Sequence, residues 1–189
     1  MENAEEQIIN SIELWSKQHK NLVIGIDGYS GAGKTTLLKQ LAGKHNFIKP
    51  VFMDDFVSTA NTKENLSLLD ENNFTNLELI WSPMDGIKKL RNVITNFKLR
   101  GKKGKVLIVE GIFLFLPEVV DSLLDKRIYL DCDKSEADKK RIQREKERWG
   151  EKYLPETDPN SFTKYFKIAY KKYEGITNPK TKADLILEP

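Results

Sequence analysis

A glycine-rich segment that ends in a lysine and two threonines is the feature of the sequence best suited to chemistry. Residues 28–36 read Gly-Tyr-Ser-Gly-Ala-Gly-Lys-Thr-Thr and satisfy the pattern G-x-x-x-x-G-K-[ST]. Glycines let successive backbone N–H groups wrap around phosphate oxygens, and the positive N-terminus of a following helix faces the same anion. The segment therefore predicts a loop that binds nucleotide phosphates, the P-loop.

Side chains and backbone of the P-loop have separate expected roles. The Lys34 ammonium is expected to reach the β- and γ-phosphates, and the Thr35 hydroxyl to ligate Mg²⁺. Thr36 follows on the same first helical turn and is expected to contact phosphate. ATP and Mg²⁺ are the cofactors that this set predicts. The predicted nucleotide-binding residues are Gly28, Tyr29, Ser30, Gly31, Ala32, Gly33, Lys34, Thr35 and Thr36.

The segments around the P-loop predict the elements that hold it. An apolar run at residues 22–26 precedes it and a helical pattern at residues 35–44 follows, a context that separates a P-loop from a chance glycine-rich turn. Further apolar runs lie at residues 106–109, 128–130 and 185–187, and further helical patterns at residues 84–100, 135–149 and 162–173. Short apolar runs that alternate with helices indicate a buried parallel sheet. The predicted fold class is α/β, a P-loop NTPase fold of three layers (α/β/α) with a central parallel sheet and a helical lid.

Two acidic sites are expected beside the P-loop, because the carboxyl ends of parallel strands meet at one edge of the sheet. Asp54 and Asp55 end a short apolar run after the P-loop helix, and Glu110 closes the run at 106–109. An acceptor hydroxyl needs a carboxylate that orients it and takes its proton, and Mg²⁺ takes oxygen ligands. Asp54 suits the first role and Glu110 the second, with Asp54 and Thr35 as further metal-site residues. Each acid also has a structural alternative. Asp54 would be a solvated or capping acid, and Glu110 would simply end its strand. For Asp55 the solvated or capping role is the favoured interpretation.

A basic segment predicts the lid. Residues 134–152 hold eight Lys or Arg and five Asp or Glu, so they account for the net charge of +3 of the whole chain. Arg141, Arg144 and Arg148 are spaced i, i+3 and i+7 and share one helix face, from which guanidinium groups reach transferring phosphates. Arg141 and Arg144 are the predicted catalytic arginines of a lid at about residues 141–160. The alternative is a solvated helix whose arginines pair with neighbouring glutamates.

The N-terminal segment predicts an amphipathic helix. Ile8, Ile12 and Trp15 are spaced i, i+4 and i+7 with charged residues between them, which indicates a helix at about residues 4–19. No internal repeat or long linker is visible, so residues 1–189 predict a single domain.

Two further patterns concern local structure. Ser135 followed by Asp138 has the spacing of a capping box and predicts the start of the basic helix. Residues 57–80 are rich in Asn, Thr and Ser without a clear period, and they predict an irregular insertion or lid segment.

Composition narrows the classes of partner and location. The chain has 189 residues with one Cys, enough to bury a core without a disulfide or structural metal. With 31 Lys or Arg against 28 Asp or Glu, and both signs interleaved, we expect no nucleic-acid partner. The early acidic residues argue against a secretory signal and no apolar run has the length of a membrane span, so we expect a cytoplasmic protein without a membrane partner.

Homo-oligomerisation is left open. His19, His45 and Cys132 lack partners at metal-ligand spacing and are interpreted as structural.

Together these motifs resemble the uridine kinase and phosphoribulokinase family of P-loop small-molecule kinases. The resemblance rests on the P-loop, Asp54-Asp55-Phe56, Leu107-Ile108-Val109-Glu110-Gly111 and the Arg141-x-x-Arg144 helix. Residues 178–186 are also similar to the closing segment of that family, which lies near the adenine site. The resemblance implies that Asp54 is the catalytic carboxylate, Glu110 the Mg²⁺-associated acid, and Arg141 and Arg144 the lid arginines over the phosphates.

The acceptor-binding segment departs from that family. Uridine kinases carry Ser-Phe-Tyr after the catalytic Asp, whereas residues 55–57 read Asp-Phe-Val. Uridine kinases also carry a His-Pro-Asp-Ala-Phe-Asp-like segment, whereas residues 81–85 of this chain read Trp-Ser-Pro-Met-Asp. The Asp-Asp-Phe run also looks like nicotinamide riboside kinases. Trp81 and Asp85 are candidates for an acceptor pocket, with a packing role as the favoured interpretation of Trp81.

The favoured function is ATP-dependent phosphoryl transfer to a hydroxyl group of a small molecule, with a nucleoside as the first candidate. Kinases of nicotinamide riboside, pantothenate, sugars or glycerate are alternatives of the same class. A nucleotide-binding regulatory protein without catalysis is an alternative of another class, although the Asn-Lys-x-Asp run of GTPases is absent from the sequence. A third hypothesis, nucleic-acid binding through residues 134–152, predicts an affinity that falls steeply with salt.

Overall fold

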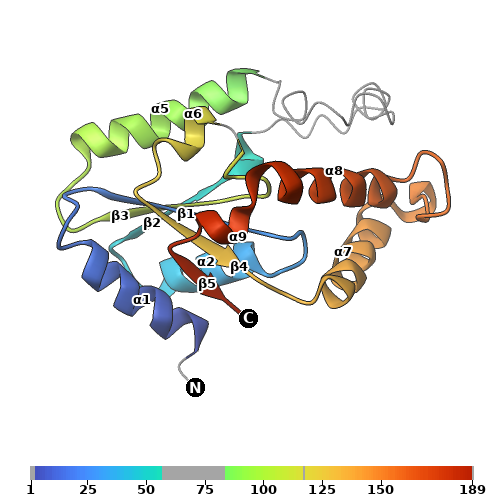
Figure 1. Cartoon of the computed structure of the whole chain (residues 1–189), viewed down its shortest axis with the longest axis horizontal. Coiled ribbons are helices and arrows are strands. Elements are labelled where there is room, and N and C mark those ends of the chain that lie inside the picture. The colour runs from blue at the N-terminus through green and yellow to red at the C-terminus, as the bar shows by residue number, and fades with distance from the viewer. Residues whose placement is uncertain (1–2, 57–83, 117, 189) are drawn as a thin grey trace.

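A five-stranded parallel sheet forms the centre of the computed structural model, which describes residues 3–56, 84–116 and 118–188 (Figure 1). The strands within these ranges are β1 (Leu22–Gly28), β2 (Ile48–Phe52), β3 (Val106–Glu110), β4 (Lys126–Leu130) and β5 (Leu185–Leu187). They lie in the order β2-β3-β1-β4-β5, and each neighbouring pair is parallel. The carboxyl ends of the five strands therefore lie at one edge of the sheet.

The two central strands are buried because both faces of the sheet are covered. Every residue of β1 and of β3 is buried. Val23 and its β3 neighbour Leu107 pack into one apolar cluster, whereas Ile24 and its neighbour Ile108 pack into the cluster on the opposite face. Apolar side chains are needed on both faces of such strands, which is why the sequence reads as continuous apolar runs. The predicted parallel strands are confirmed, and those at 22–26, 106–109 and 128–130 are buried as expected, whereas Ile186 in the strand at 185–187 is 46% exposed.

Helices complete three layers. α1 (Ala4–Trp15) and α2 (Lys34–Lys44) pack on one face of the sheet. α5 (Met84–Arg100), α6 (Glu118–Asp121) and α8 (Phe162–Thr177) pack on the other. α7 (Lys134–Trp149) and the start of α8 extend together past the end of the sheet (Figure 1), and the short helices are η1 (Met53–Asp55), η2 (Gly150–Lys152) and α9 (Pro179–Lys182). The predicted three-layer α/β/α fold is confirmed.

α1 begins with a capping box and ends earlier than its sequence pattern predicts. The Asn3 side chain accepts a hydrogen bond from the Glu6 backbone N–H at 2.9 Å, and the Glu6 carboxylate accepts one from the Asn3 N–H at 3.1 Å. Ile8, Ile12 and Trp15 are buried, as predicted. The helix stops at Trp15 rather than at residue 19. The next position on its apolar face is the polar His19, so a further turn would bury no apolar side chain.

α7 begins at a different cap from the one predicted. Asp133 is the N-cap, and its carboxylate accepts hydrogen bonds from the backbone N–H groups of Ser135 (2.7 Å) and Glu136 (3.0 Å). The capping box predicted from Ser135 and Asp138 is therefore wrong. An aspartate just before the helix satisfies the same first-turn N–H groups, which leaves the Asp138 side chain for other contacts.

Some predicted features lie outside the described residues. These are the irregular insertion at 57–80, Trp81 and the side chain of Asp85. Among the helices that the structure describes, none combines the length and apolar character needed to cross a bilayer.

The packing of β3 predicts a large loss of stability on truncation of a core leucine. Leu107→Ala removes a side chain with 0% exposure and leaves a cavity between β3 and the helices, so we expect a loss of about 2–5 kcal/mol in the free energy of unfolding. Leu99→Ala is the matched control, because Leu99 is 73% exposed and should change stability by less than about 0.5 kcal/mol. Urea titrations of the two variants measure both values, and similar losses would contradict the described core.

Candidate active site

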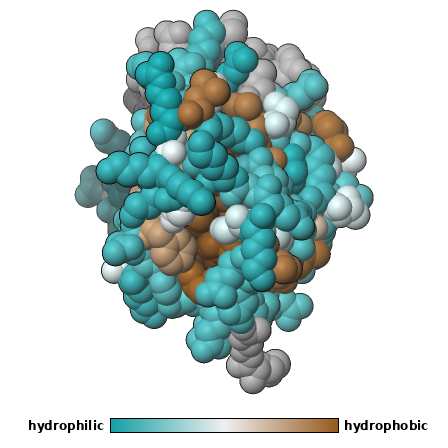
Figure 2. All heavy atoms as spheres, turned by 90° about the vertical axis from the view of Figure 1, so that its left-hand side faces the viewer, coloured by the Kyte–Doolittle hydropathy of each residue, from teal (hydrophilic) through white to brown (hydrophobic). Residues whose placement is uncertain are grey.

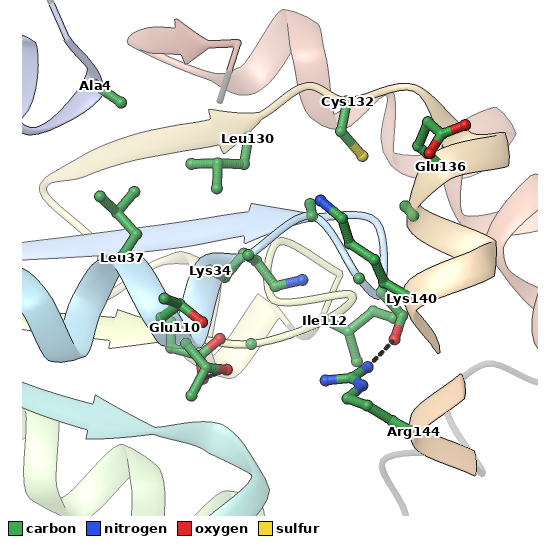
Figure 3. Close-up of a pocket in the computed structure, with 18 of the residues that line it drawn as sticks. Ala4, Lys34, Leu37, Glu110, Ile112, Leu130, Cys132, Glu136, Lys140 and Arg144 are labelled. Carbon is green, nitrogen blue, oxygen red and sulfur yellow. Dashed lines mark hydrogen bonds between the residues drawn. The ribbon is translucent and has the colours of Figure 1, made fainter. Parts of the chain in front are cut away.

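A cavity of about 730 Å³ opens at the carboxyl edge of the sheet, where segments distant in sequence meet (Figure 3). The P-loop, the ends of β2, β3 and β4, and one face of α7 surround it. The residues that line it include Ser30, Gly31, Ala32, Gly33, Lys34, Thr35, Thr36, Asp54, Glu110, Cys132, Asp133, Glu136, Lys140 and Arg144. The convergence expected of strand ends in a parallel sheet is thus present.

The P-loop takes a shape that only glycine permits at two positions. Gly31 and Gly33 have φ values of 96° and 92°, in the left-handed region that favours glycine. A side chain at Gly31 would also collide with the backbone of Ala137, so the missing side chain lets α7 pack directly against the loop. α2 starts at Lys34 without a side-chain cap, and the first-turn N–H groups are left for an anion.

The first two P-loop residues lie behind the cavity rather than in its lining. Gly28 approaches β4, where an added side chain would meet the Leu130 carbonyl oxygen at 2.5 Å. Tyr29 is 4% exposed, and its hydroxyl donates a hydrogen bond to Asp138 Oδ1 at 2.9 Å. Both residues anchor the loop to neighbouring elements, and their expected role as nucleotide contacts stays a prediction.

Lys34 is the buried cation of the site. Its ammonium donates hydrogen bonds to the carbonyl oxygens of Gly28 (2.8 Å) and Tyr29 (2.9 Å). Burial lowers the pKa of Lys34, and the carboxylates of Asp27, then Glu110, act in the opposite direction. The side chain lines the cavity, so a phosphate placed there would meet a positive charge already held beside the loop.

Thr35 and Glu110 form the part of the site suited to Mg²⁺. The Thr35 hydroxyl donates a hydrogen bond to Glu110 Oε1 at 2.9 Å. Burial raises the pKa of Glu110, and the Lys34 ammonium counteracts that rise. Within the described residues no group of three or more His, Cys, Asp or Glu is arranged to hold a metal by itself. One hydroxyl and nearby carboxylates fit Mg²⁺ as part of a shell that phosphate oxygens and water complete.

Asp54 faces the cavity and its neighbour Asp55 does not line it. β2 ends with Phe52 paired to Glu110, so Asp54, two residues further on, lies beside the Glu110 end of the cavity. The Asp54 carboxylate is also near enough to act on the pKa of Lys34. The short helix that contains Asp54 has no side-chain cap, which argues against a capping role. An exposed carboxylate at the cavity is free to meet a ligand.

The arginines of α7 do not share one environment. Arg144 lines the cavity, and its Nη2 lies 3.5 Å from Ser30 Oγ of the P-loop (Figure 3). Arg148 is exposed.

Arg141 turns away from the cavity, contrary to the expectation that it lies over the phosphates. It is 2% exposed, its Nη1 donates to Glu145 Oε1 at 2.7 Å and its Nη2 to Asp138 Oδ1 at 3.0 Å. The guanidinium also lies 4.6 Å from the centre of the Phe166 ring. In this structure the guanidinium group contacts two acids of α7 and an aromatic ring of α8, so it joins the two helices, and a role for Arg141 at the phosphates stays a prediction.

Two aspartates beside the P-loop, Asp27 and Asp138, were not identified from the sequence as residues of the site. Asp27 is fully buried at the end of β1, where burial raises its pKa and hydrogen bonds from Tyr173 and from backbone N–H groups counteract the rise. An acid within an otherwise apolar run at 22–28 was the available signal. Burial would raise the pKa of Asp138, but hydrogen bonds from Arg141 and Tyr29 outweigh it and the pKa is lowered.

A second hollow lies at the opposite end of the sheet and lacks the groups that the chemistry needs. It measures about 480 Å³ and is lined by residues 16–20, Leu22 and residues 103–105. Figure 2 shows this face, which is mostly hydrophilic with an apolar floor in the hollow. Because the P-loop, Asp54 and Glu110 all lie at the other edge, the cavity of about 730 Å³ is the candidate active site.

Comparisons with known proteins agree with this site. A family model described as an AAA domain matches residues 24–158. A uridine kinase of Chlamydia pneumoniae is 30% identical over 157 residues, covering 69% of this chain and 66% of that protein, so the match spans slightly less than two thirds of that relative. A uridine kinase of Borrelia duttonii is 26% identical over 181 residues, covering 87% of this chain and 85% of that protein. A solved structure from Bacillus stearothermophilus, described as a possible uridine kinase, matches with a TM-score of 0.58 and 18% identity over 96% of this chain and 100% of that chain.

The buried position of Arg141 predicts a structural role that its neighbours on α7 lack. Arg141→Met would remove the buried guanidinium group that pairs with the carboxylates of Glu145 and Asp138, so we expect a loss of about 3–5 kcal/mol in the free energy of unfolding. Arg148→Met is the control and should change stability by less than about 0.5 kcal/mol, because Arg148 is exposed. Chemical denaturation measures both variants, and a stable Arg141→Met protein would show that the buried network is not formed.

Proposed function

We propose that this chain, which belongs to the AAA domain family and is uridine kinase-like, transfers the terminal phosphoryl group of ATP to a hydroxyl group of a nucleoside. The chain is an ATP-dependent small-molecule kinase with an α/β P-loop fold. The nucleoside as acceptor, Mg²⁺ as the metal and the part played by each residue belong to the proposal. Uridine is the first acceptor to test, because two relatives carry its name.

The observation that carries the proposal is the meeting of three kinds of group in one cavity. Lys34 supplies positive charge beside the P-loop, the Thr35–Glu110 pair supplies oxygen ligands, and Asp54 supplies an exposed carboxylate. Phosphoryl transfer needs these groups together, because charge must be offset on the phosphates while a hydroxyl is oriented for attack. A site that only bound nucleotide would not require a carboxylate at the position of Asp54.

Binding of the phosphates follows from the loop geometry. The uncapped N–H groups at the start of α2 and the Lys34 ammonium face the same cavity, so both attract the negative charge of a triphosphate. The Thr35 hydroxyl and the Glu110 carboxylate would hold Mg²⁺, which when bound offsets phosphate charge. Arg144, which contacts Ser30 of the loop, adds a further positive charge from α7.

Transfer requires one proton to leave the acceptor. Asp54 orients the acceptor hydroxyl and accepts its proton as the new oxygen–phosphorus bond forms and the bond between the phosphoryl group and ADP breaks. Lys34 and Arg144 stabilise the negative charge on the transferring group. Both cations line the cavity together with Asp54, so this division of roles uses residues that already meet.

Asp54 provides the sharpest test of catalysis as opposed to binding. Asp54→Asn keeps the shape of the side chain but removes the proton acceptor, so we expect turnover of uridine to fall by about 10²–10⁴-fold while MgATP binding is retained. Asp55→Asn is the matched control, because Asp55 is adjacent and exposed but does not line the cavity. Steady-state ADP release measures turnover and calorimetry measures binding. Near-normal turnover by Asp54→Asn would remove Asp54 from the mechanism.

A panel of acceptors separates the nucleoside from the alternative substrates. The wild-type protein is mixed with MgATP and, in turn, uridine, cytidine, nicotinamide riboside, pantothenate, glycerate and simple sugars. We expect the largest acceptor-dependent release of ADP with a nucleoside. A larger release with a sugar, glycerate or pantothenate would contradict the nucleoside proposal, and no acceptor-dependent release with any of them would favour a regulatory nucleotide-binding protein.

A further inference from the structure

We infer that Asp27 and Tyr173 form a positioning pair, which holds the P-loop in the shape that receives phosphates and links that shape to helix α8. The inference rests on the proposed function, because it concerns the same nucleotide site. Neither residue lines the cavity, so neither is assigned contact with the nucleotide or the acceptor.

Asp27 receives hydrogen bonds from three separate parts of the fold. Its Oδ1 accepts the backbone N–H of Gly28 at 2.6 Å. Its Oδ2 accepts the backbone N–H of Phe115 at 3.2 Å and the hydroxyl of Tyr173. A fully buried carboxylate is costly unless such partners satisfy it. The residue therefore joins the P-loop, the segment after β3 and α8 at one point.

The backbone of Gly28 is held on both sides of its Cα atom. Asp27 accepts its N–H, and the Lys34 ammonium donates to its carbonyl oxygen at 2.8 Å. Gly28 has a φ of 151°, a backbone conformation that residues other than glycine rarely adopt. Asp27 and Lys34 therefore bind the backbone of the same residue, Gly28. A displaced Asp27 would release one side of Gly28, whose carbonyl oxygen is one of the two that accept hydrogen bonds from Lys34.

Tyr173 connects the backbone around Gly28 to α8, the helix that follows the predicted lid. It lies in α8, is 0% exposed and donates its hydroxyl to Asp27. Burial raises the pKa of Tyr173, so the hydroxyl keeps the proton that it donates. α8 also carries Phe166, which packs against Tyr29 of the P-loop with ring centres 5.1 Å apart. The position of α8 is therefore coupled to the loop through a polar and an aromatic contact.

Tyr170 offers a control within the same helix. It lies one turn before Tyr173, is 1% exposed and shares a hydrogen bond of 2.8 Å with the Tyr129 hydroxyl. Its hydroxyl does not reach Asp27 or the P-loop backbone in the described structure. Replacing either tyrosine by phenylalanine keeps the packed ring and deletes one buried hydroxyl. The two substitutions therefore differ in the partner that loses its hydrogen bond.

The test compares MgATP affinity with stability for these variants. Calorimetry at 15 °C gives Kd for the wild type, Tyr173→Phe and Tyr170→Phe, and thermal unfolding confirms that each is folded at that temperature. We expect Tyr173→Phe to raise Kd by about tenfold, because a charged hydrogen bond that supports the loop is lost. Tyr170→Phe should lower the melting temperature by about as much as Tyr173→Phe does, while the Kd of Tyr170→Phe stays near the wild-type value. Asp27→Asn, which keeps an acceptor for Gly28 but loses the oxygen that accepts from both Phe115 and Tyr173, should also raise Kd.

The outcomes separate this inference from the proposed function. An unchanged Kd in both Tyr173→Phe and Asp27→Asn would overturn the positioning role, and so would an equal rise in Tyr170→Phe and Tyr173→Phe, which would indicate general loosening of α8. Failure of the wild type to bind MgATP would instead overturn the proposed function. If Tyr173→Phe does not fold, the Kd of Asp27→Asn for MgATP is compared with that of Tyr170→Phe instead, and the same outcomes apply.

Discussion

The buried ammonium group of Lys34 organises the charges at the carboxyl edge of the sheet. A cation removed from water needs hydrogen-bond acceptors and negative charge nearby, or it loses its proton. Here the carbonyl oxygens of Gly28 and Tyr29 accept its hydrogen bonds, and the carboxylates of Asp27 and Glu110 supply the charge. Asp27 and Glu110 are thus part of the condition for keeping Lys34 charged before any phosphate arrives, and each of them lies at the end of a parallel strand.

The parallel sheet and the paired helices α7 and α8 hold this arrangement from two sides. The sheet brings the ends of β1, β2 and β3 together, while α7 packs on the loop where Gly31 has no side chain. Arg141 ties α7 to α8 through its contacts with Thr163 and Phe166. The helices that extend past the sheet are therefore joined to each other and to the P-loop, so a nucleotide in the cavity would contact elements that are already connected.

The sequence predicted those features whose cause is local. The P-loop pattern specifies its own backbone shape, and buried strands must be apolar, so both were identified along with Thr35, Glu110 and Asp54 as residues that meet at one cavity. The direction of Arg141 was not predictable, because helical spacing places side chains on a common face without saying whether that face meets phosphate or a neighbouring helix. The contacts of Arg141 come from Glu145 on its own helix and from α8, whose packing depends on the whole fold. The role of Asp27 was not predictable for a related reason. Its partners, Phe115 and Tyr173, are distant in sequence, and only the folded chain brings them together.

The central claim is that the cavity moves a phosphoryl group from ATP to a hydroxyl other than that of water. The most direct test follows the fate of the terminal phosphoryl group, with ATP labelled at that position, Mg²⁺ and uridine mixed with the wild-type protein. We expect the label to appear in a nucleoside monophosphate in amounts equal to the ADP formed. Label found only in inorganic phosphate, or retained in ATP that the protein binds without turnover, would contradict it.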